Sequence, residues 1–344
     1  MSVLLVAAAF VISLAMTWRF CDPRSRFHIL DQPNVRSLHT QPTPRSGGLA
    51  ILLAVYVCGI GAIYWFGQPW EASYGWLGGS SLVVAGVSYI DDRFTLTSGI
   101  RFIVHIVAAA LLVFGGFIIS RLELPGLELS LPYWIGVIFA LLFVVWMLNL
   151  YNFMDGMDGF AGGMAVFGFG TFAVMGWMAG HITFSTISMI IAAASAGFLV
   201  FNFPPARIFM GDVGSSTLGL LAAALSLWGA RDGIFPFWIA LLVFSPFIVD
   251  ATVTLFRRLL RGDKIWQAHK THFYQRLVQA GWGHRKTVLF EYAIMLGCAV
   301  TSLWSLRAPA HIQLTAFSGW AVAYLLFFFW VGRLAVRGNK AETL

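Results

Sequence analysis

The chain has 344 residues, of which 59% are hydrophobic and 11% charged, and its mean hydropathy is +0.79. These proportions exclude a soluble globular protein, because a chain of this size cannot bury so much apolar surface inside itself. Long apolar segments without strand-like alternation predict an all-α, polytopic integral membrane protein, since helices satisfy their own backbone in lipid. The cysteines Cys21, Cys58 and Cys298 are unclustered, which predicts packing residues instead of disulfides or zinc ligands.

Apolar segments follow one another along the chain, and each is long enough to cross a bilayer as a helix. The first segment is followed, not preceded, by its arginines, which predicts a span with its N-terminus outside and no cleaved signal peptide. The expected domain organisation is one bundle of about eleven helices over residues 1–344. The predicted spans are 1–18, 47–66, 73–90, 100–119, 132–150, 160–179, 182–202, 214–229, 234–256, 288–306 and 312–332.

The positive charges test this topology. Strict alternation places the following loops on one side: 20–46, 91–99, 151–159, 203–213 and 257–287. Of the 22 Lys and Arg residues, 19 lie in or beside these loops or the C-terminus, and only Arg121, Arg231 and Arg307 lie on the other side. Cytoplasmic loops are enriched in Lys and Arg, so the shared side is predicted to be cytoplasmic. The net charge of +7 therefore mainly reflects the orientation of the chain in the membrane, and it predicts no nucleic-acid partner.

Polar residues interrupt the end of the fifth predicted span. Asn149, Asn152 and Asp155 recur every three residues, so on a helix they cover an arc of about 120° and can face one cavity. Asp158 follows between glycines. An acidic residue beside apolar spans is costly unless it meets a cation or water, which indicates a functional site. A helix-capping turn is the alternative, since Asn, Asp and Gly all favour helix ends.

Further carboxylates are predicted at the same membrane face. Asp91 and Asp92 close the third span, and Asp212 precedes the eighth. Such acids repel one another without a cation, and oxygen ligands without a Cys or His cage favour Mg²⁺ over zinc. Asp250, about two turns inside the ninth span, is expected either to support this region or to be purely structural.

The turn 211–216 begins a predicted span, where free N–H groups and the helix dipole attract an anion. Beside a metal-binding acid, this turn suggests a diphosphate held at a helix end. In the last loop, His269, His272 and Arg276 would share one face of a helix. That pattern predicts a contact for phosphate or sugar, with a solvated basic face as the alternative. Together these features fit transfer from a water-soluble phosphate donor to a membrane-bound acceptor.

The motifs resemble those of the polyprenyl-phosphate N-acetylhexosamine-1-phosphate transferases, over the chain from residue 42 to the tenth span. In order, they are Asp91-Asp92, Asn149-x-x-Asn152-x-x-Asp155-Gly-x-Asp-Gly, Phe209-Met-Gly-Asp212-x-Gly-Ser and the histidine-bearing loop. The resemblance implies that undecaprenyl phosphate attacks a UDP-N-acetylhexosamine and releases UMP. It also implies a bacterial inner-membrane enzyme with a cytoplasmic site and with membrane lipid as a partner. Whether the enzyme forms a homodimer is left open.

The resemblance also implies residue roles. Asp212, with Asp155, is implied to bind Mg²⁺, for which Mn²⁺ would substitute, and Phe209 to stack on uracil. Asp91 and Asp92 are the implied catalytic pair for the lipid phosphate, with Asp91 the proposed base. That phosphate is mostly ionised at pH 7, its second pKa being near ~6, so we expect Asp91 to act more by positioning than by proton removal. The other implied substrate-binding residues are Arg45, Asn149, Asn152, Gly211, His269, His272 and Arg276.

Two departures from the family pattern affect the prediction. The lysine often found shortly after the aspartate pair is missing, so Arg93 or Arg101 is expected to supply that charge. The segment 269–276 looks more like the O-antigen-initiating branch than the peptidoglycan branch, which favours a simple N-acetylhexosamine over a muramoyl-pentapeptide donor. A cation-coupled transporter is the alternative from another class, but it predicts acids near the midplane and an internal repeat.

Overall fold

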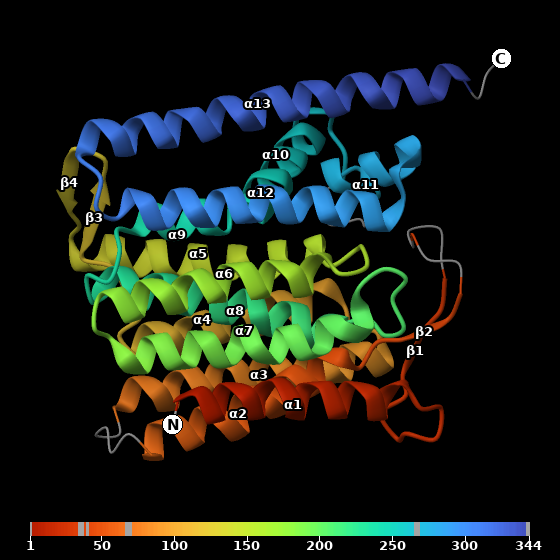
Figure 1. Ribbon diagram of the computed structural model, residues 1–344, viewed down its shortest axis with the longest axis horizontal. Coiled ribbons are helices and arrows are strands. Elements are labelled where there is room, and N and C mark those ends of the chain that lie inside the picture. The colour runs from red at the N-terminus through yellow and green to blue at the C-terminus, as the bar shows by residue number, and fades with distance from the viewer. Residues whose placement is uncertain (1, 34–37, 39–40, 66–70, 265–268, 342–344) are drawn as a thin grey trace.

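The computed structural model describes residues 2–33, 38, 41–65, 71–264 and 269–341. These residues form a helical bundle in which most helices run side by side along one axis (Figure 1). The helices are α1 (Ser2–Cys21), α2 (Gly47–Trp65), α3 (Ala72–Phe94), α4 (Ser98–Phe114), α5 (Tyr133–Met154), α6 (Phe160–Met178), α7 (Ile182–Asn202), α8 (Gly211–Arg231), α9 (Phe237–Val243), α10 (Ser245–Leu260), α11 (Phe273–Leu277), the π-helix η1 (Val278–Trp282), α12 (Gly283–Ser305) and α13 (Ala310–Ala341). The predicted all-α fold is confirmed.

Two short antiparallel hairpins lie at opposite ends of the bundle (Figure 1). In the first, β1 (Leu30–Asp31) pairs with β2 (Thr43–Pro44). In the second, β3 (Arg121–Leu124) pairs with β4 (Leu127–Ser130). The first hairpin shares its end of the bundle with α11, whereas the second lies at the end where α1 begins, as the predicted topology requires.

The part of the chain that the structure describes has fewer helices of membrane-spanning length than the sequence has apolar segments. Among the described residues, eight helices are long and apolar enough to cross a membrane, or nine if α9 and α10 count as one span. The helix α4 has only 17 residues, and α3 is diluted by serines and ends in charged residues. The multi-pass character is therefore confirmed, and the count of eleven stays a prediction.

The ninth predicted span, 234–256, is not one continuous helix. The helices α9 and α10 meet at Phe244 with a bend of 82°. Pro246 lies in the first turn of α10, where it has no N–H to continue the α9 hydrogen bonds and its ring clashes with the preceding turn. The break turns α10 away from the common helix direction (Figure 1). It also places Asp250, which is buried, in a helix that crosses the direction of its neighbours.

The bundle is centred on α8. Nearly all of its apolar window, 94%, is buried, compared with 6% for α13 at the edge. Close packing against α5 requires Gly219, because a Cβ at this position would clash with the backbone carbonyl of Met147. The first turn of this central helix carries Asp212, so the position of that carboxylate is fixed by the packing of the whole bundle.

Candidate active site

Loops distant in sequence meet at one end of the bundle. The Arg45 guanidinium is 3.5 Å from Asp92, which joins the first loop to the end of α3. Asp158 accepts a hydrogen bond of 3.0 Å from the backbone N–H of Ala206. The Tyr274 hydroxyl lies 3.4 Å from the carbonyl oxygen of Phe153. The backbone N–H of Asp212 lies 3.4 Å from Asp92, which joins these two groups of loops, so the five loops predicted to share one side are connected by direct contacts.

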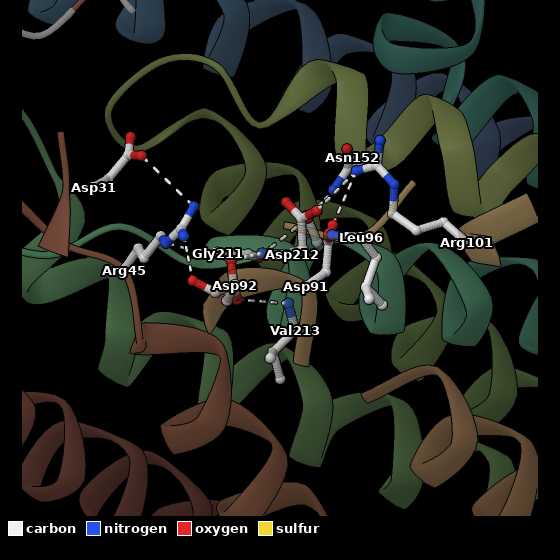
Figure 2. Close-up of polar contacts among 11 residues, drawn as sticks. Asp31, Arg45, Asp91, Asp92, Leu96, Arg101, Asn152, Gly211, Asp212 and Val213 are labelled. Atoms are coloured by element: carbon white, nitrogen blue, oxygen red, sulfur yellow. Dashed lines mark hydrogen bonds and ion pairs between the residues drawn. The ribbon is translucent and has the colours of Figure 1, made fainter. Parts of the chain in front are cut away.

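The acid cluster, defined as Asp91, Asp92 and Asp212, lies where α3 ends and α8 begins. One guanidinium nitrogen, Nη1 of Arg101, lies 3.1 Å from Asp91 Oδ2 and 3.3 Å from Asp212 Oδ2 (Figure 2). Asp91 also accepts a hydrogen bond from the backbone N–H of Leu96. A single arginine thus bridges two acids that are far apart in the sequence, one at the end of α3 and one at the start of α8.

Of the two arginines expected to supply the charge of the missing lysine, Arg101 is the one that contacts the acid cluster. The alternative, Arg93, instead lies over the ring of Tyr89, with its guanidinium carbon 4.9 Å from the ring centre. It also donates a 3.3 Å hydrogen bond to the carbonyl oxygen of Arg26. Arg93 thus contacts the first loop and not the acid cluster.

Asp92 faces the start of α8. Its carboxylate lies 3.4 Å and 3.5 Å from the backbone N–H groups of Asp212 and Val213, so the protein supplies its own anion to this helix end. Arg45 bridges Asp92 and, at 3.6 Å, Asp31 (Figure 2). Gly211 allows this close approach, since it has φ of +72° and a Cβ would clash with the carbonyl oxygen of Arg45.

The amides of the fifth predicted span line a cleft of about 410 Å³ beside Arg101 and Asp212. Asn152 donates a 3.0 Å hydrogen bond to the Ser215 hydroxyl, and Asn149 donates one of 2.7 Å to the carbonyl oxygen of Val145. The prediction that Asn149 and Asn152 face one cavity is confirmed, but Asp155 is not among the lining residues. The cleft is lined by Ser88, Ser98, Gly99, Arg101, Phe102, His105, Asn149, Asn152, Phe153, Asp212 and Ser216.

The two acids of the Asp155–Asp158 turn have different surroundings. Asp155 ends α5, and burial together with the nearby Asp212 and Asp92 raises its pKa well above the usual value. Asp158 instead lies 3.1 Å from Nδ1 of His284 and does not contact the acid cluster. Asp158 is therefore the one of the five predicted acids that stabilises neighbouring segments, through its contacts with Ala206 and His284.

The donor chemistry of this end of the bundle fits a magnesium ion, although no cage is preformed. Among the described residues, no three His, Cys, Asp or Glu side chains are grouped to hold a metal. Mg²⁺ typically uses one or two carboxylates and completes its shell with water and substrate phosphates. Asp212, whose side chain is 31% exposed and already lies beside a cation, provides such a carboxylate.

The last loop differs from its prediction. His269, His272 and Arg276 do not share a helix, because α11 begins only at Phe273. The buried carboxylate of Asp250 accepts hydrogen bonds of 3.1 Å from Nδ1 of His272 and from the backbone N–H groups of the next two residues. These bonds hold the chain extended at His272 and start the helix after it. Asp250 is thus structural, one of its two predicted roles.

The three side chains of this loop also differ in their surroundings. His272 is 4% exposed, and its ring packs 4.8 Å from that of His269. Burial, followed by repulsion from His272 and Arg258, lowers the pKa of His269 to about 4, so this side chain is neutral near pH 7. Arg276 donates a 3.0 Å hydrogen bond to the carbonyl oxygen of Thr271. The roles of these residues toward substrate stay predictions.

Some residues of the site were not predicted. Asp31 is paired with Arg45, and Ser215 bonds Asn152. Tyr274 reaches the backbone that carries Asp155. Each depends on a contact between distant segments, so spacing along the sequence gave no signal for it. Phe209 is held by backbone hydrogen bonds to Pro44 and Gly47, which places it beside the Arg45 segment, and its stacking role stays a prediction.

The middle of the chain, residues 74–230, matches the model of a family described as glycosyl transferase family 4. A relative from Bacillus subtilis (strain 168), named probable undecaprenyl-phosphate N-acetylglucosaminyl 1-phosphate transferase, is 32% identical to it. That similarity covers 84% of this chain and 82% of the relative. The chain belongs to glycosyl transferase family 4. The resemblance inferred from the motifs is thereby confirmed at the level of the family.

Other members of glycosyl transferase family 4 are also similar. A decaprenyl-phosphate N-acetylglucosaminephosphotransferase of Mycobacterium tuberculosis is 31% identical over 88% of this chain and 83% of its own length. A phospho-N-acetylmuramoyl-pentapeptide-transferase of Staphylococcus saprophyticus is 29% identical over 76% of this chain and 84% of its own length. The family match contains the whole acid cluster and Arg101.

Proposed function

We propose that this chain transfers an N-acetylhexosamine 1-phosphate from a UDP-sugar to undecaprenyl phosphate. The observation that carries this proposal is its 32% identity, over 84% of its length, to a relative named as a probable undecaprenyl-phosphate N-acetylglucosaminyl 1-phosphate transferase. The mycobacterial relative is named for the same sugar on decaprenyl phosphate. N-acetylglucosamine is therefore the first donor sugar to test. The similarity to the staphylococcal protein makes a muramoyl-pentapeptide donor the second candidate.

In this reaction an oxygen of the lipid phosphate forms a bond to the β-phosphorus of the UDP-sugar, and the bond from that phosphorus to the bridging oxygen breaks as UMP leaves. The two substrates bring several negative charges to one place. Arg101 and Arg45 are each held between two carboxylates there, so they can exchange one carboxylate for a phosphate oxygen. Positioned cations stabilise the charge on a transferred phosphoryl group.

Asp91 is proposed to hold Arg101 and not to remove a proton. Both of its oxygens already accept hydrogen bonds, from Leu96 and Arg101, and the acceptor phosphate is mostly ionised at neutral pH. The expected transfer rate is flat from about pH 7 to 9. A rate that rises steeply over this range, and loses the rise in Asp91→Asn, would contradict this role.

We also propose that Mg²⁺, or Mn²⁺ in its place, binds Asp212 with Asp155 as a second oxygen ligand. The ion would neutralise charge on the donor diphosphate. Support comes from Asp212, a partly exposed carboxylate that lines the cleft and lies beside a cation, and from the nearness of Asp155, whose pKa is raised first by burial and then by Asp212 and Asp92. Chelation of divalent ions is expected to abolish transfer, and Mg²⁺ or Mn²⁺ to restore it.

The deciding experiment uses purified protein, undecaprenyl phosphate and UDP-N-acetylglucosamine labelled in the sugar. We expect label in butanol-extractable lipid together with stoichiometric UMP. UDP-muramoyl-pentapeptide is assayed in parallel and is expected to react at least about tenfold more slowly. This ratio corresponds to a difference of about 1.4 kcal/mol in activation free energy between the two donors. The absence of lipid product from both donors, with divalent metal present, would reject the proposed function. Uptake of unmodified donor into sealed vesicles would favour a transporter.

The proposed setting is the bacterial inner membrane, with the acid cluster on the cytoplasmic side and the N-terminus outside, and the product is proposed to start O-antigen or a related surface polysaccharide. Support comes from the bias of Lys and Arg toward the loops at the acid-cluster end. The N-terminus lies at the other end (Figure 1). Labelling of a cysteine introduced at Ser2 by an impermeant reagent in intact cells tests this orientation. A homodimer stays a prediction.

A further inference from the structure

Three arginines gather where α10 ends and α11 begins, and none of them contacts the acid cluster. Arg257 and Arg276 each place the guanidinium carbon 5.3 Å from the centre of the Phe273 ring. Arg261 lies close enough to Arg276 to repel its charge. We call these three residues the arginine cluster. It holds two cations against one aromatic ring, with a third nearby.

No ion pair joins the arginine cluster to an acid among the described residues. The acid nearest in sequence, Asp263, pairs with Arg258 at 3.6 Å, and Asp250 attracts Arg276 but accepts its hydrogen bonds from His272 and α11. Residues 265–268, which lie outside the described residues, include no Asp or Glu. Like charges held together in this way are unfavourable unless an anion lies between them.

The geometry of the cluster suits a phosphate. Arg257 and Arg276 are both half-buried, so their charges are screened less than those of exposed side chains. Arg276 uses Nε to bond the Thr271 carbonyl oxygen, which orients the guanidinium and leaves its terminal nitrogens available. The Arg257 guanidinium makes no hydrogen bond among the described residues. Two guanidinium groups fixed in this way match the oxygens of one phosphate.

The surroundings of the cluster point to lipid as the source of that phosphate. On α10, Phe256, Leu259 and Leu260 have exposed fractions of 59%, 56% and 86%. Phe273 stacks at 4.0 Å on Phe328 of α13, the helix that is almost uncovered by protein. Arginines interleaved with exposed apolar side chains are typical of a helix at the membrane interface, where lipid phosphates lie. A site for free phosphate would need no such apolar surface.

We propose that the arginine cluster binds the headgroup phosphate of an anionic phospholipid. This site is separate from the transfer reaction, and it replaces the sugar or phosphate contact predicted for Arg276. A lipid bound there joins the end of α10 to the start of α11. It would therefore hold the segment anchored by Asp250 at the membrane surface.

The test measures the Kd of pyrene-labelled phosphatidylglycerol for the purified full chain in neutral detergent, with phosphatidylcholine carrying the same label for comparison. Wild type is expected to prefer phosphatidylglycerol. Arg257→Gln/Arg276→Gln should raise that Kd about 30-fold, the factor for two interfacial charges of about 1 kcal/mol each. Arg257→Lys/Arg276→Lys keeps the charges and should raise it less than about fivefold. Arg19→Gln is the matched control, because Arg19 already pairs with Asp22 at 3.6 Å, and it should have no effect beyond about twofold.

Arg257→Gln alone keeps the test valid if the double variant does not fold, because Arg257 has no hydrogen bond to lose among the residues that the structure describes. This single change should raise the Kd about fivefold. An unchanged Kd in either glutamine variant would overturn the proposal. Displacement of the labelled lipid by millimolar inorganic phosphate would show a free-phosphate site and overturn the lipid source. Displacement by equimolar undecaprenyl phosphate would make the cluster part of the acceptor site. Because binding is measured without donor, failure of transfer activity leaves this result unaffected.

Discussion

Two sites hold carboxylates at the same end of the bundle, and their charges are compensated in different ways. In the acid cluster, each carboxylate contacts the guanidinium group of Arg45 or Arg101 at 3.1–3.5 Å, although Asp91 and Asp92 also face backbone N–H groups. Around Asp250, the partners are two backbone N–H groups, the Thr254 hydroxyl and a buried histidine, each at 3.1 Å. An arginine side chain can move from a carboxylate to a phosphate, whereas a backbone N–H cannot move without local unfolding. The first arrangement suits chemistry and the second suits a scaffold.

The largest expected effect is the loss of transfer activity in Asp212→Asn. This change removes the charge that Arg101 and the proposed metal share, and the loss of such an electrostatic element typically costs about 10²–10³ in rate. The melting temperature should change little, because the side chain is 31% exposed. Asp158→Asn is the matched control, since it makes the same change outside the acid cluster, and it should lower stability more than rate. Transfer near the wild-type rate in Asp212→Asn would mean that the acid cluster does not take part in the chemistry, and the contrast with the scaffold around Asp250 would be lost.

Asp250→Ala tests the other side of the comparison. It leaves the N–H groups of Phe273 and Tyr274 buried without acceptors, and each unsatisfied group costs about 1–3 kcal/mol. We therefore expect a loss of about 2–5 kcal/mol, seen as a lower thermal unfolding midpoint in detergent. Asp263→Ala removes an exposed acid paired with Arg258 and should cost less than about 1 kcal/mol. An Asp250→Ala protein as stable as wild type would show that the scaffold role is wrong.

Arg101→Gln should have the next largest effect on transfer. Without the bridging guanidinium, Asp91 and Asp212 repel each other and the phosphates lose a cation, which we expect to cost about 10- to 100-fold in kcat/KM. Arg101→Lys should recover part of that loss, because one ammonium contacts two carboxylates less well than a guanidinium. Arg93→Gln should stay within about threefold. Equal losses in the Arg93 and Arg101 variants would mean that the bridge has no special role.

The sequence predicted the features that depend on local patterns. Apolar length placed the helices, and alternation across the membrane placed Asp91, Asp92 and Asp212 at one end. Both rest on rules that involve one segment at a time. The choice between Arg93 and Arg101 depends on how α3 and α4 pack, which spacing cannot reveal.

The sequence-based prediction failed where a distant partner changed the local structure. The spacing of His269, His272 and Arg276 suits a helix, but the carboxylate of Asp250 binds the N–H groups at the start of α11 and holds His272 extended. Pro246 indicates the break before α10, but a prediction based only on the length of the apolar segment ignores this proline. Asp31 had none, because its partner Arg45 is reached only through the hairpin of β1 and β2.

The smallest expected effect tests the contact where the two regions meet. Tyr274 is anchored by Asp250 through its backbone, and its hydroxyl touches the chain next to Asp155, where a Cβ on Gly156 would clash with it. Gly156→Ala should therefore lower the unfolding midpoint by an amount equal to about 1–2 kcal/mol, and Tyr274→Phe alone by less than about 1 kcal/mol, since its hydrogen bond is long at 3.4 Å. In the double variant the missing hydroxyl makes room for the new methyl group, so the two losses should not add. Additive losses would mean that Tyr274 does not press on this turn, and the scaffold around Asp250 would then have no direct route to the acid cluster.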